Sequence, residues 1–189
     1  MSLDYTSGSV NFRDVGEFVN LIAGKELMLK KQLYRGGKTD FCLTSSNIET
    51  PGTIINLRQS QDSKDFGAMM IHCPVSNDIE KYNTAVPEVK IWLNSVFRNF
   101  ENNELPMPLV IHCLSGKDRT GIVIGIVLML LNIPREIILQ EYLLSEGDVR
   151  RDLFDNAMEG IGNPTVYFRK LDVFKISDNL MRWFIEGRL

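Results

Sequence analysis

Four short apolar segments along the chain predict β-strands. They lie at residues 27–35, 53–57, 69–75 and 109–113, and the middle two are rich in isoleucine and methionine. Short runs of this kind, bounded by polar and turn-forming residues, are typical of strands that lie inside a sheet. The segments are therefore the predicted strands of a buried sheet.

A helical pattern lies between the third and the fourth of these strands. Over residues 86–100 the apolar side chains recur at spacings of three and four, which places them on one face of an amphipathic helix. Pro87 fits the first turn of this helix, where a backbone N–H has no partner in any case. The apolar face consists of Val89, Trp92, Leu93, Val96, Phe97 and Phe100.

The C-terminal half is predicted to be helical throughout. Residues 120–131 are almost wholly apolar and predict a central, buried helix, and Pro134 opens a second helix that runs to about Ser145. Two further helices are expected at about 148–159 and 165–184, separated by the helix-breaking segment 160–164.

The order of these elements predicts the fold class. Strands precede helices in alternation, which indicates an α/β fold: a central, mostly parallel sheet flanked by helices, with a helical C-terminal part at about 146–189. No internal repeat and no linker rich in Pro, Gly or Ser interrupts the chain. A single domain over residues 1–189 is therefore expected.

Charge and apolar content exclude several classes of protein. The net charge is −3 and no block of basic residues stands out, so binding to nucleic acid is not expected. The longest apolar run, 122–131, is too short for a membrane span of about 20 residues, and the polar segment 1–11 predicts no secretory signal. Three cysteines give no disulfide framework, which favours a cytoplasmic location.

The stretch 109–121 carries the clearest chemical signal. A buried strand ends in Cys113, five residues follow, and Arg119 then starts a helix. The backbone N–H groups of such a loop can surround one phosphate, and the helix dipole adds positive potential. Gly116 permits a turn that a side chain would hinder, and Arg119 can bind two phosphate oxygens at once. The expected phosphate-binding residues are Leu114, Ser115, Gly116, Lys117, Asp118 and Arg119.

The same loop predicts a covalent mechanism. Positive potential at a helix N-terminus favours the thiolate of Cys113, which is a competent nucleophile at neutral pH. Attack on phosphorus gives a cysteinyl-phosphate, which water then hydrolyses. The Thr120 hydroxyl is expected to hydrogen-bond the sulfur and ease its departure. The reaction needs neither a metal ion nor a cofactor.

These residues resemble a known signature. His-Cys-x5-Arg-Thr after an apolar strand resembles the protein tyrosine phosphatase superfamily, and the full run of residues 112–121 resembles its bacterial branch. Further matching segments extend the resemblance over about 11–145. The resemblance implies an α/β fold with the loop at the carboxyl end of a central strand, Cys113 as nucleophile and Arg119 as phosphate clamp. It also implies a phosphorylated protein as substrate, with phosphotyrosine or dual specificity, and phosphoinositides in some members.

Two aspartates are candidates for the acid that protonates the leaving oxygen. The bacterial branch that the chain resembles places this acid inside the loop, where Asp118 lies. The wider superfamily places it on a separate loop, and Asp78, just after a predicted strand, is the matching residue. Asp118 is the favoured acid. Lys117 adds a cation that suits a second phosphate on the substrate, or that only raises the local potential.

Three other interpretations are weaker. A nucleotide-binding phosphate loop needs a glycine where Ile111 stands and Ser or Thr where Asp118 stands. A zinc site on the two His-Cys pairs is disfavoured, because adjacent residues of a strand point to opposite faces. A phosphate-binding module that has lost turnover is the alternative function, and the intact nucleophile, arginine and threonine of the loop argue against it.

Other charged residues are expected to support the loop rather than to touch the substrate. The residues expected to form structural ion pairs that brace it are Arg13, Asp14, Arg35 and Arg58. Cys42 and Cys73 are expected to be inert.

Overall fold

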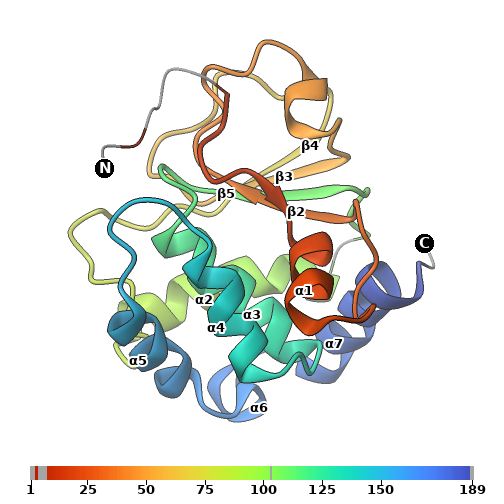
Figure 1. The fold of residues 1–189 in the computed structure, drawn as a ribbon. Helices are drawn as coiled ribbons and strands as arrows, with labels where there is room; N and C mark the ends of the chain where they lie inside the picture. Colours follow the sequence, from red (N-terminus) through yellow and green to blue (C-terminus); the bar gives the residue numbers. More distant parts are fainter. Residues whose placement is uncertain (1–2, 4–7, 103, 188–189) are drawn as a thin grey trace.

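The computed structural model describes residues 3, 8–102 and 104–187 (Figure 1). The segment 1–11, on which the expectation of no secretory signal rests, lies in part outside these residues. Among the residues described, no helix combines the length and the apolar character that crossing a membrane requires.

One five-stranded sheet organises the fold, with the strand order β1-β2-β5-β3-β4. β1 pairs antiparallel with β2, and the other neighbouring strands are parallel. The predicted α/β class with a mostly parallel sheet is confirmed. The strands are β1 (Arg13–Asp14), β2 (Leu33–Gly36), β3 (Thr53–Asn56), β4 (Met69–His72) and β5 (Leu109–His112).

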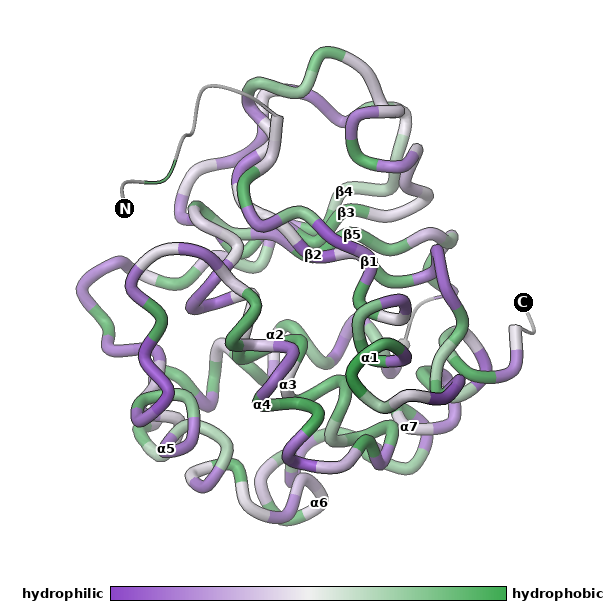
Figure 2. The backbone as a smooth tube through the Cα atoms, in the orientation of Figure 1, coloured by the Kyte–Doolittle hydropathy of each residue, from purple (hydrophilic) through white to green (hydrophobic). Residues whose placement is uncertain are grey.

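β5 lies at the centre of the sheet, and all four of its residues are buried. Its last residue, His112, lies opposite Gly36 on β2 and Asn56 on β3. The three parallel strands therefore end at one edge of the sheet, and Cys113 leaves the sheet at the middle of that edge. Ligands of open α/β sheets bind at such carboxyl-end edges. Figure 2 shows the hydrophobic stretches of β3, β4 and β5 side by side.

The helices gather on one face of the sheet (Figure 1). The opposite face is covered by the two segments on either side of β3, residues 37–52 and 57–68, the first of which includes the 3-10 helix η1 (Ser45–Ile48). A large apolar core lies on the helical side, and a smaller cluster lies under these two segments. The helices are α1 (Val15–Ala23), α2 (Pro87–Asn102), α3 (Asp118–Leu130), α4 (Arg135–Leu143), α5 (Arg151–Ile161), α6 (Pro164–Tyr167) and α7 (Val173–Met181), followed by a π-helix (Arg182–Glu186).

α3 is the central helix, as its apolar sequence predicts, and nearly all of it is buried. Two glycines on α3 let its neighbours approach closely. A Cβ atom at Gly121 would lie 2.7 Å from the Tyr142 ring of α4, and one at Gly125 would lie 2.9 Å from the Phe154 ring of α5. The two rings stack on each other, with centroids 4.0 Å apart. This packing joins α5, at the start of the C-terminal part, to α3, the helix that follows Cys113 and its loop.

The N-terminal helix α1 was not expected from the apolar pattern. Asp14 caps it, because its carboxylate accepts hydrogen bonds from the backbone N–H groups of Gly16 and Glu17, at 2.9 and 3.3 Å. The same carboxylate accepts the backbone N–H of Lys31 at 2.6 Å. The expected ion pair of Asp14 is therefore wrong, since its oxygens bind backbone amides.

The single helix predicted at 165–184 is also wrong. α6 ends at Tyr167, and α7 begins only at Val173. Asp172 explains the restart, because its carboxylate accepts the backbone N–H of Lys175 at 3.0 Å and caps the new helix. Between the two helices, Phe168 and Leu171 turn into the core.

The Tyr142–Phe154 stack generates a prediction about stability. Phe154→Ala is expected to lower the free energy of unfolding by about 3–5 kcal/mol, because it removes a buried ring from a close-packed site. Phe174→Ala is the matched control, since that ring is 77% exposed, and a change within about 0.5 kcal/mol is expected. Urea denaturation followed by circular dichroism measures both, and equal losses would show that α5 does not pack as described.

Candidate active site

The loop from Cys113 to Arg119 has a conformation that only glycine permits at its turn. β5 ends at His112, α3 begins at Asp118, and Gly116 between them has φ of +68°. A Cβ atom at Gly116 would also lie 2.6 Å from the carbonyl oxygen of Gly36. Both the positive φ and the close approach therefore require glycine at this position.

The end of β2 holds the loop through backbone contacts. The N–H of Cys113 donates to the carbonyl of Gly36 at 3.4 Å, and the N–H of Lys38 donates to the carbonyl of Leu114 at 3.0 Å. These contacts hold the start of the loop against the end of β2, a strand that is far from the loop in the sequence. Cys113 itself is buried, so the predicted nucleophile lies at the bottom of the loop.

A buried group of three charges lies beneath the loop. Arg35 donates to the Gly116 carbonyl at 2.8 Å and to Glu141 at 2.6 Å, and Arg13 donates to the other oxygen of Glu141 at 2.8 Å. Burial and the nearby Arg35 charge lower the pKa of Arg13 to about 10, which leaves it protonated at neutral pH. Two guanidinium groups and one carboxylate give this group a net positive charge, which favours an anion in the loop above it.

A second network fixes His112, the residue before the predicted nucleophile. The ring Nε2 of His112 lies 2.8 Å from Asp62, and Asp62 accepts from Arg58 at 2.6 Å. Arg58 also pairs with Asp40 at 3.0 Å. Burial alone would raise the pKa of Asp62, but the hydrogen bond and charge of His112, together with Arg58, lower it below its usual value. The expected structural ion pairs of Arg13, Arg35 and Arg58 are thus present.

The end of the loop leads directly into α3. Arg119 is 9% exposed, and its Nη1 donates to the carbonyl of Leu57 at 3.1 Å. The guanidinium is therefore oriented by the residue that follows β3. The Thr120 hydroxyl is buried and has no hydrogen-bond partner among the described residues, so the expected bond to the sulfur of Cys113 is not formed in this structure.

Asp118 is held at the rim of the loop by a pair of tyrosines. The Tyr82 hydroxyl donates to its Oδ1 at 2.5 Å, and the Tyr82 and Tyr142 hydroxyls lie 2.7 Å apart. Because Tyr82 has given its only hydroxyl hydrogen to Asp118, the hydrogen between the two tyrosines comes from Tyr142. Burial raises the pKa of Tyr82, which keeps it a donor. The Asp118 carboxylate is 41% exposed and can reach solvent.

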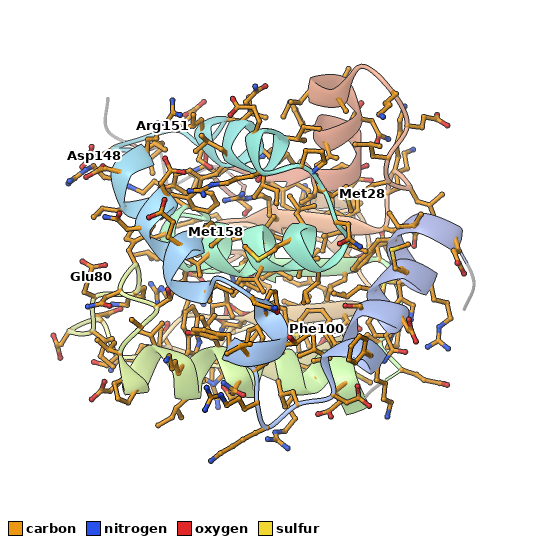
Figure 3. The ribbon with its side chains drawn as sticks, turned by 90° about the horizontal axis from the view of Figure 1, so that it is seen from below. Met28, Glu80, Phe100, Asp148, Arg151 and Met158 are labelled. Carbon is orange, nitrogen blue, oxygen red and sulfur yellow. The ribbon has the colours of Figure 1, made fainter. Side chains whose placement is uncertain are left out.

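Both candidate acids line one cavity of about 410 Å³ beside the loop, which we call the rim cavity. Asp78 is exposed there, and its nearest partner is the hydroxyl of Ser76 at 3.3 Å. Figure 3 shows Glu80 and Asp148, two further lining residues, at the same edge of the molecule. The residues of the rim cavity with polar side chains include Asn77, Asp78, Glu80, Lys81, Tyr82, Lys117, Asp118, Asp148 and Arg150.

Two lysines reach the rim cavity. The Nζ of Lys117 donates to the Asp148 carbonyl at 2.6 Å, and that of Lys81 donates to the Asn77 carbonyl at 2.7 Å. Burial and the charge of Arg119 lower the pKa of Lys81 below its usual value. Sequence reasoning identified Lys117 but missed Lys81, Tyr82 and Asp62, since no motif marks them.

The other cysteines lie away from this chemistry. Burial raises the pKa of both Cys42 and Cys73, which disfavours the reactive thiolate. No disulfide joins any of the three cysteines. His72, a member of the discounted zinc site, has its Nε2 2.9 Å from the Arg58 carbonyl. Among the described residues, no group of three or more His, Cys, Asp and Glu side chains is placed to hold a metal ion.

Comparison with known proteins agrees with this geometry. The model of the tyrosine phosphatase family matches residues 5–185. The chain belongs to the tyrosine phosphatase family. Within it, 42 residues are 43% identical to the triple specificity protein phosphatase PtpB of Mycobacterium tuberculosis (strain ATCC 25618 / H37Rv). This match spans 22% of the chain and 15% of the mycobacterial protein.

Two solved structures share the fold of this tyrosine phosphatase family member. The core catalytic domain of the PP-IP phosphatase SIW14 from S. cerevisiae, in complex with citrate, superposes with a TM-score of 0.59 at 18% identity, over 82% of this chain and 94% of that one. A second structure of the Siw14 catalytic core gives 0.58 at 18% identity, over 84% and 95%. The family model confirms the predicted superfamily, and these two structures confirm the predicted fold.

The charge group under the loop of this family member generates a second prediction. Glu141→Gln is expected to lower the free energy of unfolding by about 3–5 kcal/mol, because it leaves two buried guanidinium groups without a counter-charge. It is also expected to lower kcat/KM for a small aryl phosphate, since Arg35 positions the Gly116 carbonyl.

Glu159→Gln is the matched control, because that carboxylate is 63% exposed and pairs with the exposed Arg135. An effect below about 1 kcal/mol is expected there. Chemical denaturation and steady-state kinetics measure both variants. If Glu141→Gln were no more disruptive than Glu159→Gln, the buried group would not support the loop.

Proposed function

We propose that the chain is a phosphomonoester hydrolase that works through a cysteinyl-phosphate on Cys113. The observation that carries this proposal is the loop itself: Cys113 follows the central strand, Gly116 lies in close contact with Gly36, and Arg119 lies in the first turn of a buried helix. Membership of the tyrosine phosphatase family supports the same reaction. We also propose that residues 1–189 form a single phosphatase domain.

The reaction has two balanced steps. The Cys113 thiolate attacks phosphorus, the bond from phosphorus to the ester oxygen breaks, and the leaving oxygen takes a proton from Asp118. Water then attacks phosphorus, loses a proton to the Asp118 carboxylate, and displaces the sulfur as thiolate. Inorganic phosphate and the dephosphorylated alcohol are the products. The loop N–H groups and Arg119 stabilise the charge that develops on the phosphoryl oxygens in both steps.

Asp118 suits the acid role better than Asp78. Its carboxylate is oriented by the Tyr82 hydroxyl and lies in the loop that binds the phosphate, whereas Asp78 is exposed and contacts only its own turn. Thr120 is proposed to assist the departure of the sulfur, because its buried hydroxyl is not engaged elsewhere among the described residues. Its hydrogen bond to sulfur would form in the phosphorylated state.

The substrate is proposed to be a phosphoprotein, with phosphotyrosine or dual specificity, and to extend to phosphoinositides. The rim cavity beside the loop is lined by four carboxylates and by three cations, Lys81, Lys117 and Arg150, and these cations are the groups that would bind a second phosphate. Two of the similar proteins are a triple specificity protein phosphatase and a PP-IP phosphatase, which fits such a range. The cytoplasmic location and the absence of nucleic-acid partners stay predictions.

Removal of the nucleophile tests the mechanism. Cys113→Ser is expected to abolish turnover of p-nitrophenyl phosphate, phosphotyrosine peptide and phosphoinositide, while EDTA leaves the wild-type rate unchanged. Phosphate release measures turnover, and intact mass spectrometry of the quenched wild-type enzyme is expected to show one added phosphoryl group. Activity that survives Cys113→Ser, or that EDTA abolishes, would contradict the proposed mechanism.

A comparison of leaving groups assigns the acid. Asp118→Asn is expected to slow hydrolysis of phenyl phosphate, a poor leaving group, by about 100-fold or more, because general acid catalysis contributes about 10²–10⁴. The rate for 2,4-dinitrophenyl phosphate, whose leaving group needs no proton, should fall less than about tenfold. Asp78→Asn is expected to have a small effect, of the same size, on the rates for phenyl phosphate and 2,4-dinitrophenyl phosphate. If Asp78→Asn shows the dependence on the leaving group instead, Asp78 is the acid.

A further inference from the structure

A second groove lies on the helical side of the molecule, outside the active site. It is formed by α2 and by α6 with the residues that follow it, and it has a volume of about 500 Å³. In the view of Figure 3, α6 and the following loop lie beside α2. Ile91, which is 70% exposed, and the ring of Tyr167 give the groove an apolar floor. The Tyr167 hydroxyl donates to the Thr84 carbonyl at 2.6 Å, which fixes that ring in place.

The charges around this groove have one sign. Lys90, Arg98, Arg169 and Lys170 line it, and no Asp or Glu is found among the described lining residues. None of the four cations forms an ion pair with another described residue. The Lys90 ammonium lies over the Tyr167 ring, 5.4 Å from its centroid. Four exposed cations around an apolar floor complement an anionic partner.

The groove lies close to the rim cavity of the proposed active site, because residues near each other in the chain line the two. Tyr82 lines the rim cavity and Ala85 lines the groove. A chain covers at most about 3.6 Å per residue, so these two Cα atoms are at most about 11 Å apart. An extended segment of about ten residues spans about 33 Å. One polypeptide can therefore place a phosphorylated side chain in the loop and its flanking residues in the groove.

We infer that the groove between α2 and α6 is a docking surface for an acidic segment of the protein substrate, with an apolar side chain seated against Ile91 and Tyr167. The inference rests on the proposed function, since it names the flanking sequence that the phosphatase selects. A concave groove between two helices accommodates a chain, whereas a membrane presents a broad surface. The cations supply selection and faster encounter, and the apolar floor supplies contact area.

The test uses the full chain and two matched phosphotyrosine peptides of twelve residues. One peptide carries four glutamates and a leucine on one side of the phosphotyrosine, and the other carries serines in their place. Each peptide is made in two versions, with these residues either before or after the phosphotyrosine. For wild type, kcat/KM is expected to be about three- to tenfold higher for the better acidic peptide, mainly through KM. The preference should fall in 0.5 M NaCl, because exposed charges are screened.

Charge reversal then locates the surface. Arg98→Glu/Lys170→Glu is expected to reduce the preference below twofold while the rate with p-nitrophenyl phosphate stays within twofold of wild type. Lys25→Glu/Lys30→Glu is the matched control, with the same change in charge at exposed positions outside the groove. Thermal unfolding of each variant shows whether the fold is intact.

The outcomes separate the two proposals. If wild type has no phosphatase activity, the proposed function fails, and the groove is tested by fluorescence anisotropy with the unphosphorylated acidic peptide. Equal kcat/KM for acidic and serine peptides, or equal effects of the two double variants, overturns the docking surface. Loss of binding to phosphatidylserine vesicles in Arg98→Glu/Lys170→Glu, without any change in peptide preference, also overturns it and assigns the groove to lipid.

Discussion

The structure of the site depends on how closely the phosphate-binding loop lies against the end of β2. At Gly116 the two backbones are so near that a methyl group would strike the Gly36 carbonyl. Arg35 secures this contact from below, because it donates to the Gly116 carbonyl. Glu141 in turn keeps Arg35 in place, so a residue on α4 controls the shape of a loop 25 positions before it.

The sequence predicted those parts of the fold that follow from local pattern. The short apolar strands, the amphipathic helix α2 and the apolar helix α3 each have a periodicity that a single sequence displays. The family signature placed Cys113 and Arg119 at the correct end of the central strand. α1 was missed although a signal existed, namely Asp14 as a cap followed by apolar residues at helical spacing. The restart at Asp172 was missed because a capping aspartate inside an otherwise helical pattern was read as part of the helix.

The remaining parts of the site depend on contacts between distant segments, which a single sequence does not reveal. His112 precedes Cys113, but its partner Asp62 lies 50 positions earlier, on the loop after β3. Tyr82 orients Asp118 from a segment 36 positions away, and no motif connects the two. Both pairings form because β3 and β5 end at the same edge of the sheet and because α2 carries the chain back across it. The topology, rather than any local pattern, assembles the rim of the site.

The one-sided arrangement of the helices makes the two faces of the sheet unequal in stability. The helical face is covered by the large core, whereas the opposite face, under residues 37–52 and 57–68, has only a small cluster of Tyr34, Cys42, Ile48, Ile54 and Val110. Segments with few buried apolar contacts open locally at a lower free energy than the whole molecule. Asp40, Arg58 and Asp62, which hold His112, belong to this weaker side. Local opening of this face would therefore release His112, the residue next to Cys113, and disrupt the proposed site while the helical core stays folded.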